Sequence, residues 1–188
     1  MDLHTYSTIL TVGIILTFLA SLVVALDKKN KILNKISSNN NDNQSKYYYV
    51  LKLIAIVSSI STLGALTYQY GYSTPVCILC WWQRIFMFPV EIIMLIAIIY
   101  KTAKSHLMTF ILSGIGFMFA SYHYYYHFKG YVLGQIVSLP CDVGGLLPAC
   151  TENNGILVFG FATIPFLSLL AFASILLLSY KASTLENK

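Results

Sequence analysis

The sequence predicts an all-α integral membrane protein with five membrane-spanning helices. Hydrophobic residues make up 57% of its 188 residues and charged residues only 10%, whereas about a quarter of the residues are charged in soluble proteins. The mean hydropathy is +0.69. Five apolar runs are each long enough for a helix to cross a bilayer, which takes roughly 20 residues. This length leaves room for one helical bundle and for no soluble domain of useful size.

The first predicted span covers residues 6–26 and is followed directly by Asp27 and a series of lysines. Asp2 and His4 precede the run, whereas a signal peptide carries positive charge there. We therefore predict an uncleaved anchor. Residues 27–46 hold five lysines and a Ser/Asn-rich tract, which is too polar to bury a core, so we expect a cytoplasmic loop without regular structure. Residues 1–48 thus form an amino-terminal unit of anchor and loop.

The other four spans are predicted at residues 49–70, 80–100, 106–126 and 156–180. Tyrosines flank the second span, as is typical of membrane–water boundaries, and lysines follow the third and fifth spans. Pro89 and Pro165 are expected to kink their helices. Residues 49–182 form the main transmembrane domain, and residues 183–188 form a short cytoplasmic tail.

The distribution of positive charge predicts the orientation. Of the 12 Lys and Arg residues, all but Arg84 and Lys129 fall in or beside the loops and tail on one side. Because cytoplasmic loops are enriched in Lys and Arg, the amino terminus is predicted outside and the carboxyl terminus inside. The net charge of +5 therefore reflects orientation and contact with lipid headgroups, and it does not indicate nucleic-acid binding.

A Cys-x-x-Cys pair, Cys77 and Cys80, opens the third span. The start of a helix has unpaired N–H groups and the positive end of the macrodipole, and both favour a thiolate. Arg84 lies on the same helical face as both sulfurs. Trp81 and Trp82 are the kind of residue that lies at a bilayer surface. The sequence therefore predicts a redox centre at the outer membrane surface.

A second pair, Cys141 and Cys150, lies in the predicted external loop, residues 127–155. All four cysteines thus fall on the outer side, where disulfides persist. Four cysteines allow three connectivities, and the spacing does not choose among them. A single structural disulfide would explain the second pair taken alone. Beside the first pair, however, it predicts a two-stage thiol–disulfide relay, and Gly144 and Gly145 give the loop freedom to move.

A relay needs an acceptor for two electrons. The sequence has no haem-attachment motif and no dinucleotide-binding motif, which leaves a lipid-soluble acceptor in the bilayer. A quinone beside Cys80 would be polarised by Arg84, since a cation stabilises the developing oxyanion. Trp81 and Trp82, together with Phe86 and Phe88, are predicted to line its apolar pocket.

Two further features allow alternatives. His123 and His127, four residues apart, could complete a zinc site with Cys77 and Cys80; otherwise they belong to an interfacial aromatic belt formed with the neighbouring tyrosines. Glu91 lies within the third span. It is either a proton donor or ion-pair partner, or a protonated carboxyl hydrogen-bonded to a Tyr, Ser or Thr of a neighbouring helix.

Two segments closely resemble the DsbB family of disulfide-forming membrane proteins, nearest its BdbC branch. They are residues 75–89, PVCILCWWQRIFMFP, and residues 159–169, FGFATIPFLSL. The resemblance covers about residues 50–180. It implies a four-helix bundle in a bacterial inner (plasma) membrane that reoxidises a DsbA-like thioredoxin-fold partner and passes electrons to ubiquinone or menaquinone. Vitamin K epoxide reductase-like proteins have the two cysteine pairs in the opposite order. The first span is an addition to the four-helix core.

The resemblance also implies a role for each site residue. Cys80 would face the quinone, and Cys77 would be its exchange partner. Cys141 would form the mixed disulfide with the thioredoxin-fold protein, and Cys150 would resolve it towards Cys77. Arg84 would bind the quinone. The sequence thus predicts a quinone-dependent thiol oxidase without a metal, with a metal-binding membrane protein as the alternative.

Overall fold

The computed structural model describes residues 2–27, 33, 43–102, 104–134 and 157–186. Five long helices account for most of this part of the chain: α1 (Leu3–Leu26), α3 (Asn43–Leu66), α4 (Ile78–Tyr100), α5 (Ser105–His127) and α6 (Ile164–Glu186). Two π-helical turns, η1 (Thr67–Gly71) and η2 (Phe128–Val132), extend α3 and α5. All five helices are long and apolar enough to cross a membrane, which confirms the predicted all-α class.

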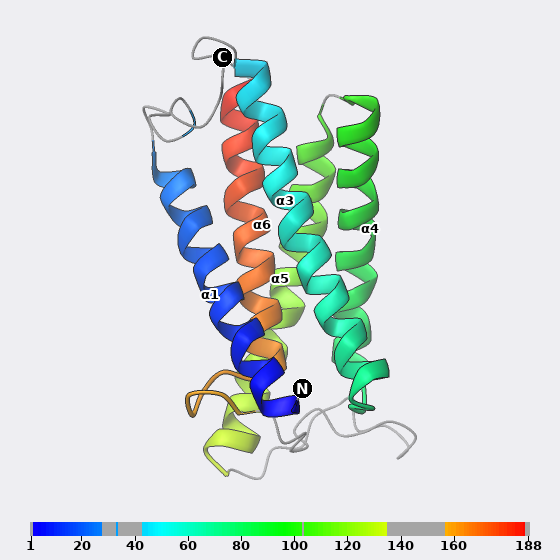
Figure 1. The fold of residues 1–188 in the computed structure, drawn as a ribbon, viewed down its shortest axis with the longest axis vertical. Coiled ribbons are helices and arrows are strands. Elements are labelled where there is room, and N and C mark those ends of the chain that lie inside the picture. The colour runs from blue at the N-terminus through cyan, green and yellow to red at the C-terminus, as the bar shows by residue number, and fades with distance from the viewer. Residues whose placement is uncertain (1, 28–32, 34–42, 103, 135–156, 187–188) are drawn as a thin grey trace.

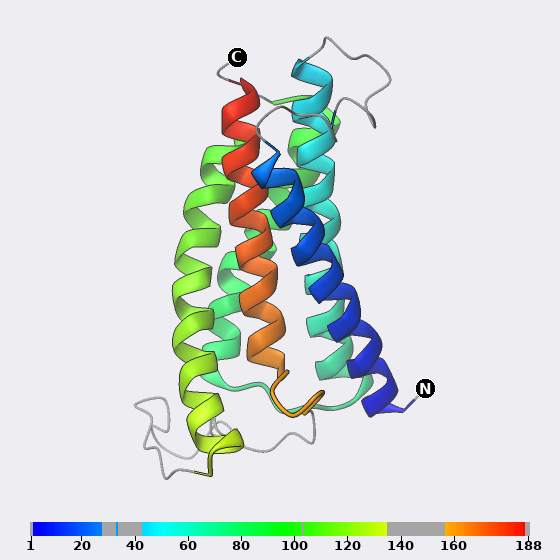
Figure 2. The same ribbon diagram turned by 90° about the vertical axis from the view of Figure 1, so that its left-hand side faces the viewer.

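The helices α3, α4, α5 and α6 form an up-and-down bundle (Figure 1). The central helix is α6, which packs against α1, α3 and α5, while α4 packs against α3 and α5. The additional helix α1 lies outside the four-helix bundle (Figure 2). The amino terminus, η1, η2 and the start of α4 lie at one end of the bundle (Figure 1), which we call the Cys77 end.

Large aliphatic and aromatic side chains fill the bundle interior. The fully buried ones include Val50, Leu51, Ile54, Val90, Met94, Phe172, Ile175 and Leu178. Other large apolar residues are exposed on the outer surface of the five helices, among them Leu16 of α1, Ile99 of α4 and Met118 of α5. A surface of this kind would cause aggregation in water but suits contact with lipid.

The second and fifth helices extend beyond the predicted spans at the end opposite Cys77. Helix α3 begins at Asn43 and α6 ends at Glu186, so parts of the predicted loop and tail are helical. Tyr47 Oη lies 3.3 Å from His106 Nδ1, and the same nitrogen lies 3.2 Å from a carboxylate oxygen of Glu186. These contacts join α3, α5 and α6, and they order helix ends that hydropathy alone assigns to solvent.

The fifth helix begins at Ile164, later than the predicted residue 156. Before it, Val158 and Ala162 exchange two backbone hydrogen bonds of 2.9 Å, and they close a turn in which Phe159 and Gly160 have positive φ angles of 55° and 77°. A helix cannot run through this conformation. Pro165 is the second residue of α6, where a missing N–H costs nothing. The predicted kink at Pro165 is therefore wrong, and this proline marks the helix start.

At the Cys77 end, helical structure after α5 continues through η2 to Val132, so the predicted loop at 127–155 starts later than expected. Cys141, Cys150, Gly144 and Gly145 lie outside the described residues, as does most of the predicted cytoplasmic loop.

Helices α5 and α6 approach each other closely at Gly116. A Cβ atom added to Gly116 would lie 2.3 Å from Cε1 of Phe172, a ring that is fully buried. Small residues allow membrane helices to pack closely in this way. The contact fixes the position of α6 relative to α5, the two helices that supply Ser168 and His123 to the site described below.

We therefore predict that Gly116→Ala destabilises the protein by about 1–3 kcal/mol, the usual cost of overpacking a filled core. The measurement is the midpoint of thermal unfolding in detergent. Gly114→Ala is the matched control, because it lies on the same helix and nothing lies within 4 Å of the added atom. Equal midpoints for the two variants would contradict the packing argument.

Candidate functional site

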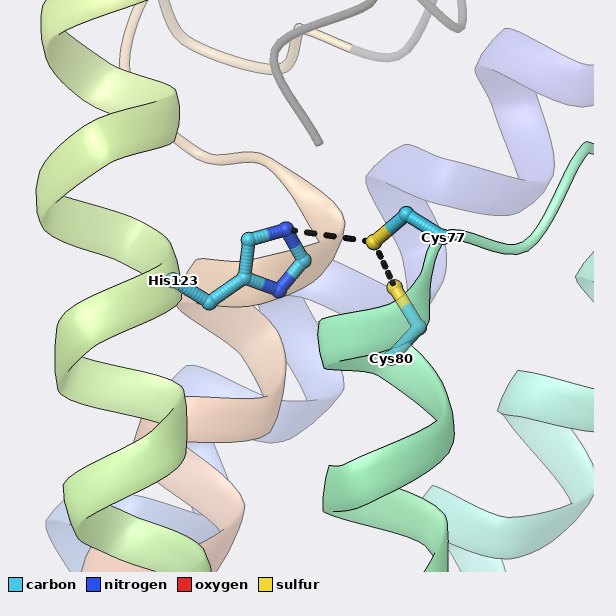
Figure 3. Close-up of side chains that lie close together, drawn as sticks. All are labelled: Cys77, Cys80 and His123. Atoms are coloured by element: carbon cyan, nitrogen blue, oxygen red, sulfur yellow. Dashed lines mark hydrogen bonds between the residues drawn. The ribbon is translucent and has the colours of Figure 1, made fainter. Parts of the chain in front are cut away.

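Cys77 and Cys80 lie at the start of α4, as the sequence predicts. Cys77 is the N-cap residue with an extended backbone, and its carbonyl accepts a hydrogen bond of 3.2 Å from the Trp81 N–H. The two sulfurs lie 3.3 Å apart (Figure 3), little more than an ångström beyond a disulfide bond length. The positive end of the α4 dipole lies beside them and favours a thiolate. The pair can open and close as a disulfide with only a small movement.

His123 of α5 faces this pair. Its side chain is 2% exposed, and its Nε2 lies 3.6 Å from Cys77 Sγ (Figure 3). Its other ring nitrogen, Nδ1, lies 2.9 Å from the amide nitrogen of Gln83. The Gln83 amide oxygen in turn accepts a hydrogen bond of 2.6 Å from the Ser168 hydroxyl.

This hydrogen-bond chain defines the tautomer of His123. An amide nitrogen can only donate, so Nδ1 of His123 must accept. The ring proton then resides on Nε2 and points at Cys77 Sγ. Ser168, Gln83 and His123 come from α6, α4 and α5, so three helices together direct one N–H donor at the buried sulfur. A hydrogen bond of this kind stabilises negative charge on the Cys77 sulfur.

The predicted alternative, that the histidines form part of an interfacial aromatic belt, is wrong. His123 is 2% exposed and His127 is 7% exposed, and both line the interior cavity described below. Tyr122 and Tyr125, by contrast, are exposed. Residues four apart share one face of a helix; here that face looks into the bundle, whereas Tyr122 and Tyr125 lie on other faces of α5.

The ligand atoms of Cys77, Cys80 and His123 lie within 4.8 Å of one another, close enough to hold one metal ion. The hydrogen bonding of His123 argues against this use. A ligating histidine usually donates its other N–H to an acceptor, whereas the partner of Nδ1 here is an amide donor. His127, the fourth predicted ligand, lines the same cavity. The arrangement therefore favours thiol chemistry over zinc binding.

Arg84 is buried in the second turn of α4. Its guanidinium donates a hydrogen bond of 3.0 Å to the Ala65 carbonyl and another to the Gln69 side-chain oxygen, and it lies 5.3 Å from the centre of the Trp81 ring. All three partners are neutral. Among the described residues no carboxylate pairs with Arg84, so its charge is available to an anion that forms nearby.

Trp81 and Trp82 lie on the outer surface of α4, 41% and 42% exposed. Trp81 covers the Arg84 guanidinium, and Trp82 stacks on Phe119 of α5 with a centroid distance of 5.4 Å. The described cavity is lined by Phe88 but by neither tryptophan. Trp81 therefore reaches the site only through Arg84.

A largely apolar cavity connects these residues. It opens to the surface on one side, and its empty space amounts to about 1140 Å³ when the open solvent at its mouth is included. Each of the five helices contributes to its wall. The polar side chains and sulfurs facing it include Cys77, Cys80, Gln83, Arg84, His123 and His127, and the apolar side chains include Leu10, Ile14, Met87, Phe88, Leu167 and Phe172.

Glu91 is hydrogen-bonded to a neighbouring helix, one of the two predicted outcomes. The Ser59 hydroxyl of α3 donates a bond of 3.1 Å to a Glu91 carboxyl oxygen. Glu91 does not line the cavity, so its position gives no support to a role as proton donor to a molecule bound there. The contact joins α3 to α4 near the middle of the bundle.

Sequence reasoning missed Gln83 and Ser168. A signal was present for Gln83: it is a polar side chain three residues after Cys80, inside an apolar span, where an amide must find a partner. Ser168 gives no such signal, because serines are common in membrane helices and bond to their own backbone. Cys141 and Cys150 stay predictions, since they lie outside the described residues.

The fold and the site define a class, namely a helical membrane protein with a dithiol pair at the wall of an internal cavity. Residues 48–182 match the family described as disulfide bond formation protein DsbB, and the chain belongs to this family. Its role is therefore in disulfide bond formation.

Curated relatives agree. The chain is 35% identical over 123 residues to the SPbeta prophage-derived disulfide bond formation protein B of Bacillus subtilis, covering 65% of this chain and 78% of that protein. It is 36% identical over 131 residues to a probable disulfide formation protein of Oceanobacillus iheyensis, and this match covers 69% of this chain and 85% of that protein. A probable disulfide formation protein of Coxiella burnetii is 34% identical over 127 residues, and this match covers 65% of this chain and 80% of that protein. No solved structure matches the chain.

The hydrogen-bond chain predicts the reactivity of Cys77. In a protein whose other three cysteines are serine, His123→Ala should slow alkylation of Cys77 at neutral pH by about ten- to a hundredfold, the effect of losing a hydrogen bond to a charged group of about 1.5–3 kcal/mol. Gln83→Leu removes the donor that keeps the His123 ring proton on Nε2, and it should slow the alkylation of Cys77 less than His123→Ala does. The measurement is the rate of reaction with iodoacetamide.

His127→Ala is the matched control, because it removes a second buried imidazole from the same cavity wall and leaves the chain from Ser168 to Cys77 intact. Equal slowing by His123→Ala and His127→Ala would show that the cavity polarity, and not the directed N–H, governs this thiol.

Proposed function

We propose that the protein is a quinone-dependent thiol–disulfide oxidoreductase that reoxidises a DsbA-like thioredoxin-fold protein outside the cytoplasm. One observation carries the proposal: the Cys77–Cys80 pair and the Arg84 guanidinium line the same largely apolar cavity. Sulfur chemistry and a site for a lipid-soluble acceptor thus coincide. A bound quinone would accept two electrons and two protons and leave as quinol.

The thiol steps follow from the resemblance. The dithiol of the partner attacks the Cys141–Cys150 disulfide, forms a mixed disulfide at Cys141, and leaves oxidised when its second thiol displaces Cys141. The reduced loop pair then attacks Cys77, which breaks the Cys77–Cys80 disulfide, releases Cys80 as a thiolate and leaves the loop pair oxidised. Two electrons and two protons thereby pass from the partner to the Cys77–Cys80 pair. Oxidation of this pair by the acceptor restores the starting state.

Five of the residues that line the cavity have a task in this scheme. Cys80 and Arg84 would hold the quinone ring, and the Arg84 guanidinium would stabilise negative charge on its oxygen, as a preorganised donor does in a water-poor site. The Nε2–H of His123 would stabilise negative charge on Cys77 Sγ whenever this sulfur is released. Gln83 and Ser168 would keep the imidazole in the required tautomer.

The orientation belongs to the proposal. We assign the Cys77 end to the outer face of a bacterial inner (plasma) membrane and the carboxyl terminus to the cytoplasm. The lysine distribution supports this assignment, because Lys46, Lys101, Lys104 and Lys181 lie towards the opposite end, between or near helix ends there. The outer compartment is also where disulfides persist.

A metal-binding role is the second candidate, and the proximity of the Cys77, Cys80 and His123 ligand atoms is the observation in its favour. It makes a different prediction for the purified protein: stoichiometric zinc bound tightly, and no effect of quinone on the thiols.

The deciding experiment is anaerobic mixing of the purified protein with quinone and a reduced DsbA-like protein, followed at the quinone absorption band. We expect one quinone reduced per disulfide formed in the partner, and no reduction with Cys77→Ser or Cys80→Ser. A partner whose second cysteine is replaced should accumulate a mixed disulfide with Cys141, because no thiol then displaces Cys141, whereas Cys141→Ser should abolish this species. Tight zinc together with unchanged quinone absorption would refute the proposal.

Arg84→Met should raise the apparent KM for quinone and slow turnover, by about ten- to a hundredfold in total, since a charge-assisted contact in such a site is worth about 1.5–3 kcal/mol. Exchange between the partner and the loop cysteines should stay nearly unchanged. Arg84→Lys should rescue only in part, because a point charge lacks the planar fork that also holds Ala65 and Gln69.

Lys129→Met is the control for Arg84→Met. Lys129 is a cation at the same end of the bundle, 4.6 Å from the Tyr125 ring centre, and it does not line the cavity. If Arg84→Met shows wild-type quinone kinetics, or if Lys129→Met has an equal defect in KM and turnover, then Arg84 does not bind quinone specifically and only anchors the helix at the membrane surface.

A further inference from the structure

Helix α1 lies before the family match, which begins at residue 48, and it is nevertheless firmly docked. At one end the Lys181 ammonium of α6 donates a hydrogen bond of 2.5 Å to the Asp27 carbonyl. At the Cys77 end the Tyr6 ring contacts the rings of Tyr68 and Tyr72, with centroid distances of 5.2 and 5.3 Å. These contacts hold α1 against both α6 and the α3–η1 segment.

Helix α1 contacts α3 at Gly64. A Cβ atom added there would lie 3.1 Å from a terminal methyl carbon of Leu10, so Leu10 rests on the α3 backbone. Gly64 and the next residue, Ala65, both line the cavity, and the Ala65 carbonyl is the acceptor of the Arg84 hydrogen bond. Leu10 is therefore close to the part of α3 that positions Arg84.

Two residues of α1, Leu10 and Ile14, form part of the cavity wall. They are four apart and share one helical face, and Ile14 is buried. Figure 2 shows α1 crossing the seam between α6 and α3, the two helices that supply much of the remaining wall. The wall that α1 adds is purely aliphatic, in contrast to the sulfur, imidazole and guanidinium groups contributed by α4 and α5.

We propose that α1 is part of the acceptor site, and that Leu10 and Ile14 contact the hydrocarbon side chain of the quinone while its ring meets Cys80 and Arg84. This inference rests on the proposed function. The cavity wall has a polar part and an aliphatic part. These match the two parts of an isoprenoid or alkyl quinone, which has a polar redox-active ring and an apolar side chain. Leu10 and Ile14 are thus specificity-determining residues that distinguish quinones bearing a side chain from quinones without one.

The test compares two acceptors with the same benzoquinone ring, one carrying a decyl chain and one a methyl group. In the double variant Leu10→Ala, Ile14→Ala the KM for the decyl quinone should rise by about tenfold, because several buried apolar contacts are lost. The KM for the methyl quinone should stay within about twofold of the wild-type value. Such a result would also show that the variant is folded. The partner-to-loop exchange rate should not change.

The matched control is Ile9→Ala, Leu16→Ala, which removes side chains of the same kind from the opposite face of α1, where both residues are 60% exposed. It should leave both KM values unchanged. If the first double variant loses activity with both quinones, the milder Leu10→Val, Ile14→Val pair decides, and it should show the same selectivity with a smaller increase.

Equal KM changes for the two quinones in the cavity-facing variants, or the same selectivity in the control, would overturn the role of α1. A wild-type protein that reduces both quinones, with the variant unchanged, overturns this inference alone. A wild-type protein that reduces neither overturns the proposed function and the inference with it.

Discussion

The site depends on the side-chain amide of Gln83. Gln83 lies on α4, and its amide accepts a hydrogen bond from Ser168 of α6 and donates one to His123 of α5. Both hydrogen bonds form only when the three helices are correctly positioned along and around their axes. Lipid offers no substitute partner, and an unpaired amide inside the bundle costs several kcal/mol. The need to satisfy Gln83 therefore also fixes the direction of the imidazole relative to Cys77. In this protein, bundle packing and thiol chemistry share the same hydrogen bonds.

Arg84 is held by a different part of the structure. Its carbonyl and amide acceptors come from the end of α3 and from the π-helical turn η1, and π-helical segments are frequent at functional sites. A regular α-helical continuation would point Gln69 in another direction. The wider turn allows the chain both to reach Cys77 and to hold the guanidinium through the neutral acceptors of Ala65 and Gln69. The result is a buried positive charge that neutral acceptors hold in a fixed orientation, and an oriented charge can stabilise negative charge on a bound molecule.

The sequence alone was sufficient to predict the features that depend on amino-acid composition and on the periodicity of an α-helix. The five apolar runs predict the five helices, and the three- and four-residue intervals place Cys77, Cys80 and Arg84 together. It was insufficient where tertiary partners decide. The ends of α3 and α6 follow from the Tyr47, His106 and Glu186 contacts, and the inward direction of His123 follows from the rotation of α5 in the bundle. Gln83 becomes interpretable only when Ser168, 85 residues away, lies beside it.

The docking of α1 on α6 has a consequence for the order of assembly. These two helices are the first and the last of the five to leave the ribosome, and Asp27 is joined to Lys181 across 154 residues. The contacts of Tyr6 and Leu10 with the α3–η1 segment become available early, whereas most of the surface that α1 packs against is synthesised last. The cavity wall is therefore completed only after the whole chain has entered the membrane, and a chain stalled before α6 has thiols but no closed site beside them.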